Sequence, residues 1–205
     1  MLGAAAVLVL LVATVVGVSW WRGRDTPPAP SLPKETATPT GELRGGLRPA
    51  AGSFVGYRVN ETLIGVGLNA AVGRTSAVKG VAAVAAGRIV AARFEIETGT
   101  LRSDEARRDE TMRFRGLETD RYPNAGFVLT APALAARFAA RGRLTLHGRT
   151  RPVTVRLQSR RDGAGVDLAG STPIEFSDYG MEPPSVAGVA SVRDHGKLEV
   201  RLRLR

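Results

Sequence analysis

Apolar and polar residues alternate with a period of two through most of the chain after Ser53. Val55, Tyr57 and Val59 fall on one face of a segment near the start of this region. The last segment shows the rule most clearly, because charged residues separate its apolar ones, Leu198, Val200, Leu202 and Leu204. Successive side chains of a strand point to opposite faces, so this period predicts strands with one buried face.

The alternation predicts eight or nine strands. They lie near residues 53–60, 62–69, 74–86, 88–99, 125–131, 138–147, 152–160, 164–176 and 196–204. Because each strand has one polar face and turn signals such as His147-Gly148 separate them, we expect an antiparallel sheet. A closed barrel and a two-sheet sandwich both fit this pattern. Small inward residues such as Ala92 and Gly170 favour the barrel, since about eight strands can then hold one small ligand.

One charge-dense stretch breaks the alternation, LRSDEARRDETMRFRGLETDRYPNAGF from Leu101 to Phe127. Ser103 is a suitable N-cap, and the two acidic residues after it lie where the helix dipole favours negative charge. We predict a short helix from Ser103 to Gly116. The least polar positions of the stretch, Ala106, Met112, Phe114 and Leu117, are expected to turn toward the mouth of the barrel, so that the insert acts as a lid. An ordinary connecting helix, with ion pairs of little net value, is the alternative.

The N-terminal region differs in composition from the rest. An apolar run from Leu2 to Trp21 is long enough to cross a bilayer, so residues 1–21 are expected to be a transmembrane anchor or a signal. Residues 22–52 are rich in proline and threonine and are predicted to be a disordered linker. The β-barrel domain is then expected over residues 53–205. This arrangement predicts a single-pass protein of the cell membrane with an extracellular or periplasmic domain, although Arg22 and Arg24 favour the opposite orientation.

The composition also excludes some kinds of site. Cysteine is absent, so no disulfide and no thiolate metal site can form. The two histidines, His147 and His195, lack partners at metal-ligand spacing, and no Gly-x-Ser-x-Gly motif occurs. We therefore assign no catalytic residue, no metal ligand and no cofactor, and we do not expect an enzyme.

The charge of the chain is strongly positive. Lysine and arginine number 29 against 19 acidic residues, a formal net charge of +10. Such an excess is typical of proteins that bind nucleic acid. Here the arginines are scattered along outward strand positions, form no run of five and accompany no known nucleic-acid-binding motif. Nucleic acid is therefore not expected as a partner, and a homodimer stays open.

Five ordered segments carry a resemblance to a known family. They are GYRVNETLIGVG (56–67), AVGRTSAVKG (71–80), LRSDEARRDETMRFRGLETDRYPNAGFVLT (101–130), GRLTLHGRTRPVTVRL (142–157) and STPIEFSDYGMEPPSVAGVASVRDHGKLEV (171–200). Over about residues 50–205 the chain resembles the YceI-like family of polyisoprenoid-binding, lipocalin-like proteins. The resemblance implies an extended eight-stranded antiparallel barrel with a helix at one end. Its function would be to bind, sequester or transport an isoprenoid or other long-chain lipid; a non-enzymatic interaction module with a packed barrel is the alternative.

The resemblance and the inward faces together predict a ligand-binding set. Its members are the inward aromatic and aliphatic residues and the lid: Tyr57, Phe94, Ile96, Arg108, Met112, Phe114, Phe127, Leu129, Leu144, Leu146, Ile174 and Phe176. The guanidinium of Arg108 would meet a phosphate or carboxylate head group, or else pair with Asp104 or Asp109. Two departures from the family pattern occur: many members carry a histidine where this sequence has Asn60 and Glu61, and an arginine where Phe176 stands.

Overall fold

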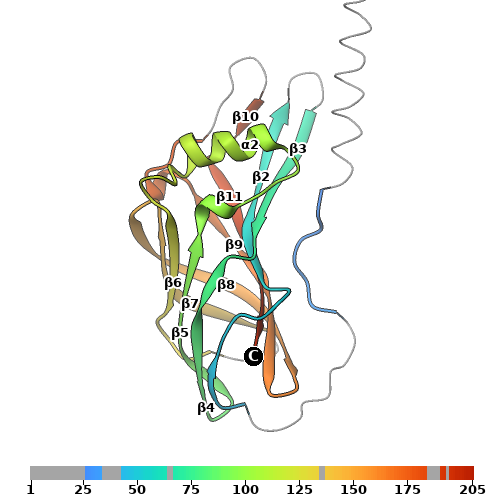
Figure 1. The fold of residues 1–205 in the computed structure, drawn as a ribbon, viewed down its shortest axis with the longest axis vertical. Helices are drawn as coiled ribbons and strands as arrows, with labels where there is room; N and C mark the ends of the chain where they lie inside the picture. Colours follow the sequence, from blue (N-terminus) through green and yellow to red (C-terminus); the bar gives the residue numbers. More distant parts are fainter. Residues whose placement is uncertain (1–25, 34–42, 64–66, 134–136, 184–189, 193) are drawn as a thin grey trace, which may run out of the picture.

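The computed structural model describes residues 26–33, 43–63, 67–133, 137–183, 190–192 and 194–205 (Figure 1). These residues form one antiparallel sheet of eleven strands, with short helical segments at one end. The strands are β1 (Gly45–Leu47), β2 (Phe54–Leu63), β3 (Gly67–Thr75), β4 (Val78–Ala85), β5 (Arg88–Glu97), β6 (Asn124–Leu129), β7 (Arg137–Leu146), β8 (Arg149–Asp162), β9 (Gly165–Glu175), β10 (Ala190–Val192) and β11 (His195–Leu204). They follow the order β1-β4-β5-β6-β7-β8-β9-β11-β2-β10, and β3 pairs with β2.

The sheet curls because two connections join the ends of this order. β1 pairs with β4, and immediately after β1 the N–H groups of Arg48 and Ala50 donate to the carbonyls of Arg205 and Arg203, at 2.7 and 2.8 Å. β3 and β4 are separated only by residues 76 and 77, yet β3 pairs with β2 and β4 pairs with β5. The all-β prediction is therefore confirmed, and the curled sheet surrounds an interior.

The prediction of eight strands is wrong. The short strands β1 and β10 come from regions where no strand was expected, since three residues are too few to show a period of two. The boundaries near residue 65 also differ, because β2 continues to Leu63 and β3 begins at Gly67. The predicted strand 62–69 therefore belongs to two strands, and the predicted strand 74–86 is divided between β3 and β4.

A strict period of two through Ala92 would place Val90 on the same inner face, but Val90 is 42% exposed. The register explains this: Ala91 pairs with Ala83 and Ile89 pairs with Val84, so Val90 is an extra residue in a bulge. A bulge reverses the alternation on one side of it. Ile89 takes the inner position instead and is almost fully buried.

The segment 26–33 lies against the outside of the sheet (Figure 1, blue). Arg58 Nη2 donates to the carbonyl of Pro27, and Arg74 Nη2 to the carbonyl of Pro28, each at 2.6 Å. Both guanidinium groups also bind the carboxylate of Glu199, whose side chain is only 2% exposed. This buried carboxylate holds the two arginines in position for the proline carbonyls.

Within the predicted linker of residues 22–52, the described residues make ordered contacts with the sheet. Leu43 is fully buried, and β1 pairs with β4. Composition alone did not show this, because a few backbone groups and one leucine make the contacts. The rest of the predicted division into segments stays a prediction.

The turn η2 (Thr98–Thr100) precedes the charge-dense insert, and the insert forms the helix α2 (Ala106–Thr111) and a π-helical turn, η3 (Met112–Gly116). The predicted N-cap, Ser103, is wrong: Glu105 caps α2 and accepts from Arg107 N–H. Ser103 instead donates its hydroxyl to Asp109 Oδ1 at 2.7 Å. A further turn, η4 (Ser177–Tyr179), lies at the same end of the sheet (Figure 1).

The predicted localisation also needs correction. Among the described residues, no helix has the length and apolar character needed to cross a membrane. The prediction of a single-pass cell-membrane protein with an external domain rested on residues 2–21, which lie outside the described residues. The structure therefore supplies no spanning helix for it.

Candidate functional site

The curled sheet encloses an apolar cavity of about 190 Å³. Residues from β2, from β4 to β9 and from β11 line it, mostly at every second position. The lining side chains are aliphatic and aromatic except for the polar Tyr57, Thr98 and Thr172, while Glu199, which also borders the cavity, points its carboxylate to the arginines on the outer face. The period of two that was evident in the sequence is thus what makes the interior apolar.

Nine of the twelve predicted ligand-binding residues line this cavity. They are Tyr57, Phe94, Ile96, Phe127, Leu129, Leu144, Leu146, Ile174 and Phe176. They come from β2, β5, β6, β7, β9 and the residue that follows β9, so the fold brings together residues that are far apart in the sequence. Whether these nine bind a ligand stays a prediction.

The other three predicted residues are not in the cavity wall. Met112 packs against the hydrophobic cluster beside the cavity, whereas Phe114 is 56% exposed. Both were expected to face inward, but residues two apart on a helix point in nearly opposite directions. Leu117 takes the inner position, since its N–H donates to Met112 O at 2.7 Å across the wide π-helical turn.

Arg108 does not face the cavity as an unpaired cation. Its guanidinium donates to Glu61 Oε1 at 3.0 Å and also binds Asp104 Oδ1. Burial disfavours the charge, but the carboxylates of Glu61 and Asp104 outweigh that effect and raise the pKa of Arg108. Glu61 Oε1 accepts a second bond from Asn69 Nδ2 at 2.7 Å. The structural pairing that was the alternative for Arg108 is therefore what the structure contains.

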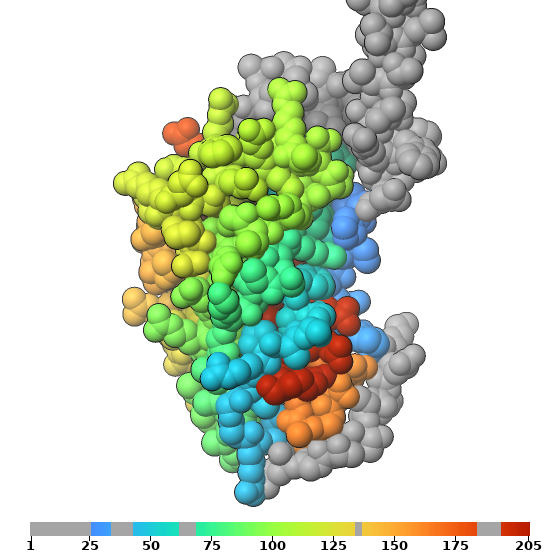
Figure 2. Space-filling model, viewed as in Figure 1, coloured from blue at the N-terminus to red at the C-terminus, as the bar shows by residue number. Residues whose placement is uncertain are grey.

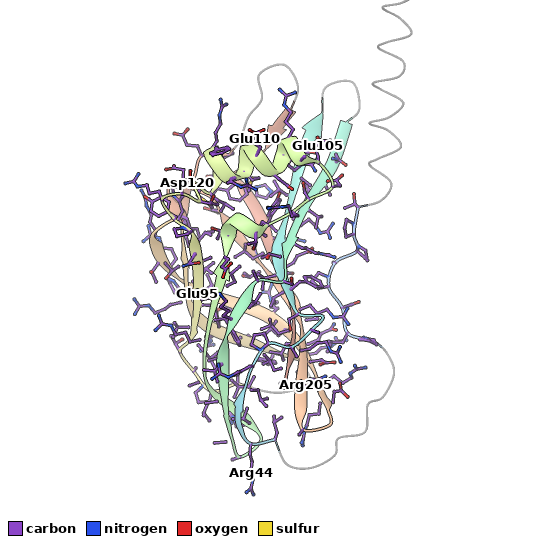
Figure 3. The ribbon with its side chains drawn as sticks, in the orientation of Figure 1. Arg44, Glu95, Glu105, Glu110, Asp120 and Arg205 are labelled. Atoms are coloured by element: carbon purple, nitrogen blue, oxygen red, sulfur yellow. The ribbon has the colours of Figure 1, made fainter. Side chains whose placement is uncertain are left out.

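The insert covers one end of the cavity. Leu101 and Leu117 from the insert, and Met181 from the segment after η4, contribute to the lining there. Figure 2 shows the insert, in yellow-green, across the upper end of the molecule. Glu105 and Glu110 lie along α2 at this end, and Arg44 and Arg205 lie toward the other (Figure 3). The apolar side of the insert thus closes the cavity and its charged side faces outward.

His147 fastens the insert to the neighbouring turns. Its Nε2 lies 3.1 Å from Glu118 Oε1, and its Nδ1 lies 3.2 Å from the carbonyl of Tyr179. The ring of Tyr122 lies against the imidazole, with 4.3 Å between the ring centroids. In the part of the chain that the structure describes, no three acidic or histidine side chains gather as a metal site would require.

Sequence reasoning missed several lining residues. Thr98 and Leu101 lie in the turn after β5 and at the start of the insert, and Met181 follows the turn after β9; no period of two marks an inward side there. Leu117, by contrast, was expected to turn toward the barrel and does line the cavity, whereas Ala106 is exposed. The positions of Thr98, Leu101 and Met181 depend on how the turns fold back across the end of the sheet.

Gly142 gives Phe127 its place in the cavity wall. A Cβ at Gly142 would lie 2.3 Å from the Phe127 ring and 2.7 Å from the carbonyl of Val128. We therefore expect Gly142→Ala to lower the free energy of unfolding by about 1–3 kcal/mol, measured by urea denaturation. Gly126→Ala is the matched control, because its Cβ would meet nothing closer than 3.8 Å. Equal stability of the two variants would contradict the close packing of Phe127 on Gly142.

The fold and the cavity define an all-β protein whose curled antiparallel sheet encloses an apolar interior closed at one end by a helical insert. The family model of the YceI-like domain matches residues 49–204. The chain belongs to this family, and the resemblance found in the sequence is confirmed.

Individual relatives agree with this assignment. A UPF0312 protein of Pseudomonas putida strain W619 is 33% identical over 99 residues, which cover 44% of this chain and 52% of that protein. A polyisoprenoid binding domain from Saccharophagus degradans has a similar fold, with 17% identity, a TM-score of 0.64 and coverage of 79% of this chain and 98% of its own. BcnA of Burkholderia cenocepacia is 18% identical with a TM-score of 0.61, over 76% of this chain and 97% of its own. The chain spans about half the length of the curated relatives it matches.

Proposed function

We propose that this protein binds an isoprenoid or a similar amphiphilic lipid inside its curled sheet, in order to sequester or transport it. The observation that carries the proposal is the cavity of about 190 Å³ with its nearly continuous apolar lining. Moving hydrocarbon from water into such surroundings is favourable by about 25 cal/mol for each Å² of buried surface. A long apolar chain is the kind of ligand that gains most from this lining.

Small side chains support this reading of the interior. Five alanines contribute to the cavity wall: Ala82, Ala92, Ala125, Ala133 and Ala140. Protein interiors are normally packed without such spaces, and open apolar cavities can accept apolar ligands. A structural module with a packed barrel, the alternative function, would need larger side chains at these positions.

The comparisons support the same class of ligand. The polyisoprenoid binding domain of Saccharophagus degradans shares the fold, and this chain belongs to the YceI-like family. The proposed contacts to the hydrocarbon are the nine cavity residues predicted from the sequence. The function is one of binding, and the absence of catalysis stays a prediction.

Organic extraction of the purified protein followed by mass spectrometry tests the proposal. We expect one lipid in a stoichiometric amount, and we expect the delipidated protein to take up an added isoprenoid. A protein that yields no lipid and binds none would contradict the proposal and favour the packed module.

A further inference from the structure

Among the polar side chains of the cavity wall, Tyr57 differs in having a hydroxyl that no described residue bonds. Thr98 donates to the carbonyls of Tyr122 and Pro123, at 3.0 and 2.8 Å, and Thr172 donates to the carbonyl of Thr154 at 3.1 Å. Glu199 is held by its two arginines. The hydroxyl of Tyr57 makes no hydrogen bond to any described residue, although the side chain is only 8% exposed.

The packing of Tyr57 fixes where this hydroxyl lies. A Cβ at Gly73, on the neighbouring strand β3, would come within 2.4–2.8 Å of the far edge of the ring and its oxygen. The ring therefore extends over Gly73, inside the sheet. The hydroxyl is not among the fully enclosed polar atoms that lack a partner, so its oxygen keeps accessible surface. A ligand in the cavity that carries an acceptor oxygen can therefore accept a hydrogen bond from it.

Charges of both signs act on this hydroxyl. The guanidinium of Arg108 has the largest effect, and the carboxylates of Asp109, Glu61 and Asp104 oppose it. Arg108 is already bound by Glu61 and Asp104, so it offers no unpaired positive charge to a ligand. A phosphate or carboxylate head group placed here would find this guanidinium already paired and would be repelled by the nearby carboxylates.

We infer that the lipid bound in this cavity has an uncharged head that carries an acceptor oxygen, and that the hydroxyl of Tyr57 donates a hydrogen bond to it. The inference rests on the proposed function and specifies the ligand's head group. Burial raises the pKa of Tyr57, so the phenol keeps its proton and acts as a donor. The head group is thus selected by one hydrogen bond and by the exclusion of negative charge.

Four ligands with one C15 isoprenoid tail separate these contributions: farnesene, farnesyl methyl ether, farnesol and farnesyl phosphate. Farnesene has no head oxygen, and the ether can only accept a hydrogen bond. We expect the delipidated full-length chain to bind the ether and the alcohol about three- to ten-fold more tightly than farnesene, as one hydrogen bond provides. The phosphate should bind at least about ten-fold more weakly than the alcohol. Isothermal titration calorimetry measures the four dissociation constants.

Tyr57→Phe removes only the hydroxyl, so farnesene should bind as before while the ether loses its advantage. Thr172→Val is the matched control, because its hydroxyl also lies in the cavity wall but already bonds to a backbone carbonyl. That variant should keep the preference for the ether, and thermal unfolding checks both folds.

An unchanged preference in Tyr57→Phe, or tighter binding of the phosphate than of the alcohol, would overturn the inference while leaving lipid binding intact. Failure of all four ligands to bind would instead count against the proposed function.

Discussion

Ala140→Phe is expected to abolish lipid binding and to leave the protein folded. Ala140 lies on β7, is buried and lines the cavity. A phenyl ring there would occupy space that the proposed ligand needs. We therefore expect the dissociation constant for the lipid to rise at least about ten-fold. Because the ring fills a cavity, the melting temperature should stay the same or rise. Isoprenoid titration and thermal unfolding of the same samples measure both effects.

The adjacent residue provides a matched control. Ala139 lies on the same strand but faces outward and is exposed. Ala139→Phe adds the same ring to the outer face and should leave binding unchanged. If both variants bind lipid normally, the ligand does not use this cavity.

Arg108→Ala is expected to destabilise the protein strongly. Removing the guanidinium would leave Glu61, a buried carboxylate, without its cationic partner. Breaking a buried pair in this way lowers the free energy of unfolding by about 2–4 kcal/mol, a little less than for a fully enclosed pair. Urea denaturation measures the change. Lys79→Ala, which breaks the exposed pair with Glu97, should have little effect.

A double variant tests the cause of this loss. Arg108→Met combined with Glu61→Leu removes both charges and should recover most of the stability, because no buried charge is left unpaired. A double variant no more stable than Arg108→Ala would mean that Arg108 acts through packing of the insert. We do not expect Arg108→Ala to weaken the binding of anionic ligands more than that of neutral ones, since the guanidinium is already paired with Glu61 and Asp104.

The sequence predicted the inner faces of the long strands well. Tyr57, Phe94, Leu144 and Ile174 all line the cavity, because a period of two is a local property of each strand. The pattern was weaker wherever the backbone departs from a regular strand or helix. The bulge at Val90 reversed one face, and of the two insert residues Phe114 and Leu117, both expected to turn inward, only Leu117 lines the cavity.

The roles of the charged residues could not be read in the same way. Arg108 pairs with Asp104, four positions away, as the sequence suggested, but it also binds Glu61, which is 47 positions away. Glu199 follows the outward alternation of β11, yet it is buried beneath Arg58 and Arg74. Such pairs depend on the register between strands, which local patterns do not specify.

By itself, the sequence determined that the protein is an antiparallel β structure with an apolar inner face and a polar insert, because alternation and composition act over neighbouring residues. Its five motifs also determined the family. The tertiary structure alone decided that the described residues form a sheet of eleven strands, that Arg48 and Ala50 after β1 bond to the end of the chain around β11, and that a cavity remains inside. It also decided that Arg108 is paired with Glu61 and Asp104, whereas no described residue bonds to the hydroxyl of Tyr57. These features arise from contacts between distant segments, whose geometry is set only when the whole sheet curls.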